Sequence, residues 1–110
     1  MKVLTGEIFI KKEKLEECGI FHPIKLDYYK EINNLDEKTN LNKAKYGILI
    51  VKTDYLDNDL KIEEKEIKNL TNDEYTANRI LKIFKDNQVT PINSEEILLD
   101  LVKQRFFFES

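Results

Sequence analysis

The sequence predicts an α+β domain in which an antiparallel sheet of about four strands is followed by two helices packed on one face. Three observations support this class. Two segments near the N-terminus alternate apolar and polar side chains, residues 46–70 have the form of a hairpin, and the apolar residues after them recur at helical spacing. A chain of 110 residues is the size of a single domain, and residues 1–110 are assigned to one.

The first strand is predicted over residues 3–11, where the alternation places Leu4, Ile8 and Ile10 on one face. The next residues, 12–17, suit one helical turn, and the glycine and proline that follow predict a turn region.

Alternation resumes at Ile24, so a second strand is predicted there with Leu26 and Tyr28 on the same face. Residues 33–45 are polar and show no period, which indicates a surface loop. The loop is long for a compact domain, and this length leaves room for a functional role.

Tyr46–Tyr55 is predicted to be an interior strand, because its first six residues are apolar on both faces. Short polar side chains then favour a tight turn, and the strand returns over Leu60–Leu70. Ile62 and Ile67 would face opposite sides of a regular strand, so we expect a bulge near residues 64–66 that restores the phase.

The first helix is predicted to begin with a capping box formed by Thr71 and Glu74. Its core face has helical spacing and consists of Ala77, Ile80, Leu81 and Phe84. Pro91 requires a turn, and a second capping pattern, Asn93 with Glu96, predicts a helix that runs toward Phe106.

Composition excludes several classes of function. The 18 basic and 21 acidic residues give a net charge of −3, which favours no polyanionic partner, and the helix that begins Ser94-Glu95-Glu96 carries the wrong charge to approach phosphates. The longest aliphatic run is too short to span a bilayer. A single cysteine, Cys18, is typical of a cytoplasmic protein. We therefore expect a cytoplasmic protein that binds neither nucleic acid nor membrane.

No catalytic, metal or cofactor site is predicted. One histidine, His22, cannot form a histidine cluster, and pairing it with Cys18 as a nucleophile would need a helix that the neighbouring glycine and proline disfavour. The acidic residues 54–59 lack the glycine and terminal glutamate of a calcium loop, so turn chemistry explains them. The expectation is a protein that is not an enzyme and has no cofactor.

The aromatic run near the C-terminus is the candidate interaction surface. Three consecutive rings on a helix point about 100° apart, so one core cannot cover all of them. We expect Phe106 to pack within the domain, and Phe107 or Phe108 to contact another chain, most simply in a homodimer.

Several motifs resemble a family of short proteins of unknown function from Gram-positive, spore-forming bacteria. The resemblance covers residues 46–102 and includes Tyr46-Gly47-Ile48, Val89-Thr90-Pro91-Ile92 and Leu98-Leu99-Asp100. Members commonly have histidine where this chain has Asn93. The resemblance implies the order of elements and a bacterial cytoplasmic origin, and it implies no catalytic activity.

The leading hypothesis is a non-catalytic interaction or regulatory module that binds another protein through the sheet face, loop 33–45 or the aromatic C-terminus. The alternative is an inhibitor, encoded by a mobile element, of a host nucleic-acid enzyme, although the intermixed charges argue against a nucleic-acid mimic. A small enzyme is the third hypothesis, and it would require a deep pocket lined by carboxylates or tyrosines with shifted pKa values.

Overall fold

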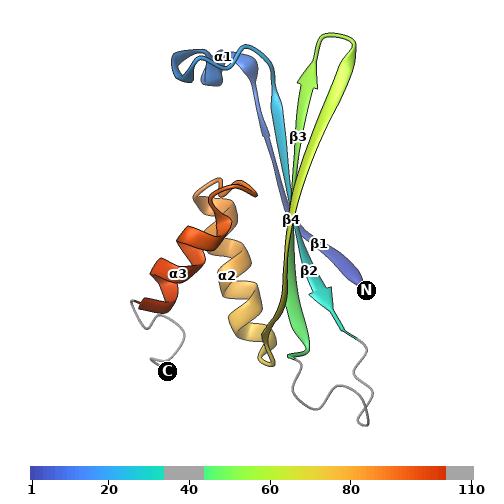
Figure 1. The fold of residues 1–110 in the computed structure, drawn as a ribbon, viewed down its shortest axis with the longest axis vertical. Coiled ribbons are helices and arrows are strands. Elements are labelled where there is room, and N and C mark those ends of the chain that lie inside the picture. Colours follow the sequence, from blue (N-terminus) through green and yellow to red (C-terminus); the bar gives the residue numbers. More distant parts are fainter. Residues whose placement is uncertain (34–43, 104–110) are drawn as a thin grey trace.

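The computed structural model describes residues 1–33 and 44–103 and shows one antiparallel sheet with two helices against one face (Figure 1). The strands lie in chain order and are β1 (Lys2–Ile10), β2 (Ile24–Ile32), β3 (Tyr46–Leu56) and β4 (Asp59–Thr71). The helical elements are α1 (Lys12–Leu15), the 3-10 turn η1 (Glu16–Cys18), α2 (Glu74–Asp86) and α3 (Ser94–Lys103). The predicted fold class is confirmed. In the described residues, no helix combines the length and apolar character needed to cross a membrane.

The hydrophobic core lies between the sheet and α2. β3 is an interior strand as predicted, because it pairs with β2 on one side and β4 on the other, and its Ile48 and Ile50 are fully buried. The predicted core face of α2 is confirmed as well, since Ala77, Ile80, Leu81 and Phe84 are all buried.

The connection between α2 and α3 is fastened to the middle of the sheet. Val89 is buried, and its carbonyl oxygen accepts a hydrogen bond of 2.7 Å from the hydroxyl of Tyr28, which is also fully buried. Burial raises the pKa of this phenol, which therefore stays a donor. Ser94 begins α3 and donates to the carbonyl of Pro91. The Val-Thr-Pro-Ile segment thus sets where α3 starts.

The predicted bulge at residues 64–66 is wrong. The pairing of β3 with β4 is continuous from Leu56 and Asp59 to Ile48 and Ile67, and the register shifts only between Ile48 and Tyr46. The extra β4 residues lie opposite Gly47, and Asn69 among them has a left-handed φ of 56°. Ile62 and Ile67 consequently do face opposite sides, and Ile62 is exposed. Regular pairing along most of β4 therefore leaves Ile62 exposed.

The predicted face of β1 is wrong at Leu4. A register shift between Leu4 and Gly6 moves Leu4 to the face opposite Ile8 and Ile10. Thr5 is the additional residue, and its hydroxyl donates to the carbonyl of Tyr28. Period-2 alternation holds only while the pairing is regular, so a single inserted residue reverses the face of everything before it.

The capping box predicted from Thr71 is wrong, because Asp73 is the N-cap of α2 and its carboxylate accepts from the backbone N–H of Thr76. The Thr76 hydroxyl also donates to this carboxylate, at 2.6 Å, and this hydrogen bond, followed by that of the Thr76 N–H, holds the pKa of Asp73 below its usual range. Thr71 accepts from the N–H of Asp73 and so supports the cap from outside the helix. At the start of α3, Asn93 uses its Oδ1 to accept from Thr90.

Candidate functional site

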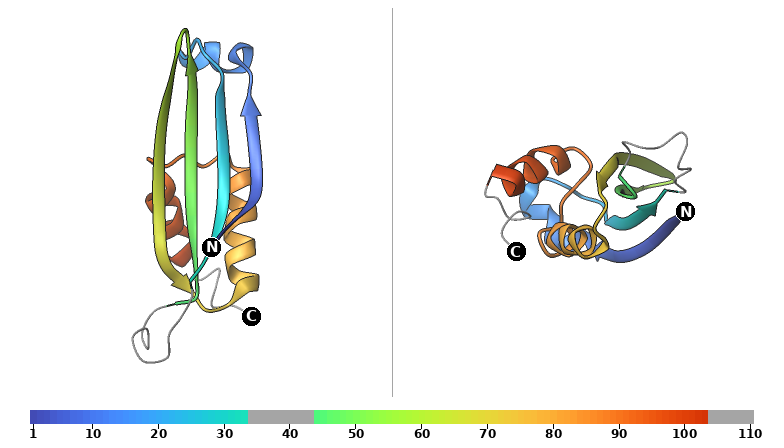
Figure 2. Two further views of the ribbon diagram at one scale, coloured as in Figure 1. Left: turned by 90° about the vertical axis from the view of Figure 1, so that its right-hand side faces the viewer. Right: turned by 90° about the horizontal axis from the view of Figure 1, so that it is seen from below.

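The face of the sheet turned away from α2 and α3, here called the open face, is left uncovered by the described elements. Figure 2 shows the sheet from this side, with both helices behind it. Because Ile48 and Ile50 point into the core, Leu49, Val51 and the alternate residues after them belong to the open face. The residues registered with these on the other strands share that face.

One row of the open face crosses all four strands and ends in exposed apolar side chains. The row runs from Phe9 on β1 through Lys25 and Thr53 to Ile62 on β4. Phe9 is 56% exposed and Ile62 is 61% exposed. Beside this row, the ring of Tyr55 lies 6.0 Å from that of Phe9 in a tilted arrangement. We use the name apolar row for Phe9, Lys25, Thr53 and Ile62, together with Tyr55 and the exposed neighbour Leu60.

The adjacent row is acidic. It consists of Glu7, Asp27, Val51 and Glu64, one from each strand. Lys25 reaches into it from the apolar row, with its Nζ 3.4 Å from Glu7 and 3.6 Å from Asp27. These carboxylates, Asp27 first, raise the pKa of Lys25. The open face therefore presents apolar and acidic rows side by side.

Asp27 is the most deeply placed charge of the acidic row. It is only 8% exposed, and its Oδ1 is buried with no hydrogen-bond donor in the described part of the chain. The ammonium of Lys25 neutralises it at ion-pair distance only. A buried carboxylate oxygen without a donor is costly, and a further donor from outside would relieve that cost.

A pair of carboxyl groups, Glu31 and Glu66, continues the open face toward the start of β3. They lie on either side of Leu49 and Gly47, on β2 and β4. Burial, and then the hydrogen bond with Glu66, raise the pKa of Glu31, whereas the hydrogen bond with Lys68 lowers that of Glu66. Of the two groups, Glu31 therefore holds its proton to higher pH.

We expect the Glu31→Gln variant to gain stability over the wild type as the pH rises. The folded state holds the Glu31 proton more tightly than the unfolded chain does. The contribution of this group to the free energy of unfolding is therefore fully present below its unfolded pKa, and it is lost as the pH rises through the raised folded pKa. Glutamine cannot ionise. Urea unfolding at about pH 4 and about pH 7 measures the difference.

Glu64→Gln is the matched control, since it removes one exposed carboxylate from the same face and its gain between these pH values should be smaller. Equal gains for the two variants would show that the environment of Glu31 is not special.

Among the described side chains, His22 and Asp54 form a pair that resembles a catalytic His–Asp arrangement. They lie on the helix-facing side of the sheet, near its end. The Nε2 of His22 lies 2.7 Å from Oδ1 of Asp54, and Nζ of Lys52 lies 3.7 Å from Oδ2. Asp54 is 5% exposed, so its assignment to turn chemistry was wrong. Cys18 is exposed, and in the described part of the chain no hydrogen bond joins it to His22. The pair anchors the segment before β2 to β3.

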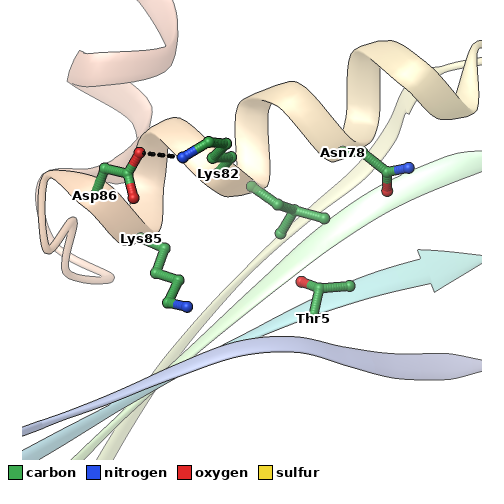
Figure 3. A pocket seen from close by; sticks show the side chains of 6 residues that line it. Thr5, Asn78, Lys82, Lys85 and Asp86 are labelled. Atoms are coloured by element: carbon green, nitrogen blue, oxygen red, sulfur yellow. Dashed lines mark hydrogen bonds and ion pairs between the residues drawn. The ribbon is translucent and has the colours of Figure 1, made fainter.

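Two of the shallow grooves formed by the described residues flank the helices. The first, about 360 Å³, lies between β1 and α2, where Thr5 faces Lys85 and Asn78 while Lys82 pairs with Asp86 at 2.8 Å (Figure 3). The second, about 470 Å³, separates β4 from α3. Across residues 1–33 and 44–103, no group of three His, Cys, Asp or Glu side chains is placed to hold a metal ion.

The predicted interaction residues Phe106, Phe107 and Phe108 lie outside the described residues, as do residues 34–43 of the predicted loop. The ends of that loop are joined by a hydrogen bond from the Asn33 N–H to the Lys45 carbonyl. The sequence reasoning named the sheet face as one of three possible contact surfaces, but it identified none of the residues of the open face. The available signal was the second face of each strand, which also carries large side chains such as Phe9 and Tyr55.

The chain belongs to a family of unknown function, DUF6514, which matches residues 6–104. The match begins N-terminal to the resemblance and includes β1 from Gly6 onward and all of β2. No curated protein and no solved structure matches the chain significantly.

Proposed function

We propose that this member of the DUF6514 family is a non-catalytic interaction module that binds a basic protein surface through the open face of its sheet. The observation that carries the proposal is the apolar row beside the acidic row. Phe9 and Ile62 are more than half exposed at the two ends of the row, with Lys25 and Thr53 between them. Exposed apolar side chains bordered by charged ones are typical of a protein-binding surface.

The charges of the open face indicate the chemistry of the partner. Glu7, Asp27 and Glu64 stand in one row with Lys25 as their only basic neighbour by register. The exposed carboxylates of Glu7 and Glu64 would accept hydrogen bonds from lysine or arginine side chains of the partner. A partner with basic side chains flanking an apolar strip would match both rows.

The proposal of a non-catalytic role rests on the sequence, which has one histidine, one cysteine and no recognisable phosphate-binding loop. The single cysteine and the motifs shared with bacterial proteins support a role in a bacterial cytoplasm.

We expect the Phe9→Ser variant to lose the partner of the wild-type protein. Tagged wild-type and variant proteins would serve as bait in the native cell, and the captured protein would then be titrated in purified form. Phe9 is 56% exposed, so its loss should leave the domain folded while removing an apolar anchor from the contact. Binding should also weaken with added salt, because the acidic row contributes to it.

Leu99→Ser is the matched control. Leu99 is 59% exposed, but it lies on α3, behind the sheet, so this variant should keep wild-type binding. If Phe9→Ser and Leu99→Ser retain the same partner with equal affinity, the open face is not the binding surface. Capture of a nucleic-acid enzyme that the protein inhibits would favour the alternative, an inhibitor encoded by a mobile element.

A further inference from the structure

We infer that β4 is the contact surface of a two-fold symmetric dimer, in which the β4 strands of two copies pair antiparallel with Ile62 at the axis. This inference is independent of the partner proposed above, because it rests on the backbone and charges of the sheet edge. The dimer would join the two sheets into one continuous sheet, with both open faces on the same side.

The edge of β4 has free backbone groups in the correct orientation. β4 is the last strand of the sheet, so one side of it has no neighbouring strand among the described residues. The N–H of Tyr55 bonds to the carbonyl of Pro23, on the β2 side, so its pair with Leu60 is not a hydrogen-bonded one. Leu60, and by alternation Ile62 and Glu64, therefore direct their N–H and C=O groups away from β3. The Leu60 N–H donates to Oδ1 of Asp59 at 2.8 Å, so the dimer would exchange that hydrogen bond for one across the contact.

β4 is also the more regular of the two sheet edges. Its pairing with β3 is unbroken from Asp59 to Ile67, whereas the bulge at Thr5 interrupts β1. Bulges disfavour edge-to-edge pairing, and β4 has none over this stretch. The tip of the β3–β4 hairpin extends beyond α2 and α3, which leaves space for a second copy (Figure 1).

The charge sequence of β4 favours a register with Ile62 at the axis. In a two-fold antiparallel pair, residues equally far from the axis on opposite sides face each other across the two chains. With Ile62 at the axis, Lys61 faces Glu63 of the second copy, and Asp59 faces Lys65 of the second copy. Symmetry repeats each pair, so the register contains opposite charges and no like charges.

Neighbouring registers bring like charges together. An axis at Lys61, Glu63, Glu64 or Lys65 places that residue against its own copy. An axis at Glu63 also opposes Lys61 to Lys65, and an axis at Lys65 opposes Glu64 to Glu66. Charged edge residues usually prevent sheet association, but here they disfavour these four registers relative to the one at Ile62. An axis at Leu60 also opposes Asp59 to Lys61, but it lies beside the turn and pairs a shorter stretch of β4.

The same residues have partners within one chain that the dimer would supplement. Lys61 lies 3.2 Å from Glu63, and Lys65 lies 2.6 Å from Glu95 on α3. Lys61 and Glu63 would each gain a second, cross-strand partner. The two Ile62 side chains, 61% exposed in one chain, would become neighbours across the axis on the open face.

A charge-reversal cycle tests the register by sedimentation over a concentration series. The wild type should dimerise. Lys61→Glu would place two pairs of like charges across the axis, and we expect it to raise the dimer Kd roughly tenfold or more. The double variant Lys61→Glu, Glu63→Lys should restore the wild-type Kd. Failure of the double variant to recover association would overturn the proposed register.

Ile62→Pro tests the use of the edge itself. The N–H of Ile62 points away from β3, so proline removes a donor that the monomer does not use, and circular dichroism should show a folded sheet. We expect this variant to be monomeric. A wild type that stays monomeric at all concentrations, or a dimer that survives both Ile62→Pro and Lys61→Glu, would refute the β4 contact.

Cross-linking identifies the axis independently. In a Cys18→Ser background, oxidation should convert the Ile62→Cys variant into a covalent dimer, because the two positions at the axis would lie about 5.5 Å apart. The Glu64→Cys variant in the same background should remain uncross-linked, since its counterpart lies farther along the strand. The reverse result would place the axis at Glu64.

Discussion

Replacing Phe84 by alanine is expected to lower the free energy of unfolding by about 3–5 kcal/mol. Phe84 is fully buried on α2, within the cluster that contains Ile48, Ile50 and Val89. Its removal would leave a cavity at the contact between the helix and the sheet, and it would also loosen the turn whose Val89 N–H bonds to the carbonyl of Phe84. Urea denaturation followed by circular dichroism measures the change.

Tyr75→Ala is the control for this experiment. Tyr75 lies on the same helix but is 66% exposed, so its loss should cost less than about 1 kcal/mol. A cost below about 1 kcal/mol for Phe84→Ala would contradict the packing of α2 on the sheet.

Gly47→Ala is expected to destabilise the protein by about 1–3 kcal/mol or more. A Cβ at this position would lie 2.6 Å from the carbonyl oxygen of Ile67 and 3.2 Å from a carboxylate oxygen of Glu31. The obstacle is backbone at the start of the β4 bulge, and it can move only if the strand pairing around Ile48 shifts. Thermal and urea unfolding should both report the loss.

Gly6→Ala provides a matched comparison in the same sheet. A Cβ there would also meet a close atom, at 2.8 Å, but that atom is Cδ of the flexible Lys85 side chain, which can rotate away. Replacing glycine by alanine also lowers the entropy of the unfolded chain, so this variant should be neutral or slightly stabilised. Equal destabilisation by the two variants would mean that the backbone contact at Gly47 is relieved without cost.

The order and type of the elements follow from local pattern. Tyr46–Tyr55 was predicted as the interior strand because it is apolar on both faces, and it lies between β2 and β4. The core face of α2 follows from helical spacing alone. These features depend on residues close together in the chain, so a short stretch of sequence is enough to predict them.

For parts of β1 and β4, the side of the sheet that each residue faces could not be predicted. Leu4 and Ile62 were placed by assuming where the pairing is regular, and the actual irregularities lie at Thr5 and opposite Gly47. The position of a bulge depends on what the partner strand offers, such as a glycine that lets a backbone approach. The choice of Asp73 over Thr71 as N-cap has a similar origin, since both residues can cap and the end of β4 decides between them.

The sequence by itself determined that this chain forms an antiparallel sheet followed by two helices, and that α2 has one apolar face. Only the tertiary structure decided which face of the sheet the helices cover. Both faces carry large side chains, but the described helices pack on one side, so Ile50 is buried while Phe9 and Ile62 stay in solvent. The contact between His22 and Asp54, 32 residues apart, could not be predicted from the sequence either. Contacts between distant segments form only once the strands are in register.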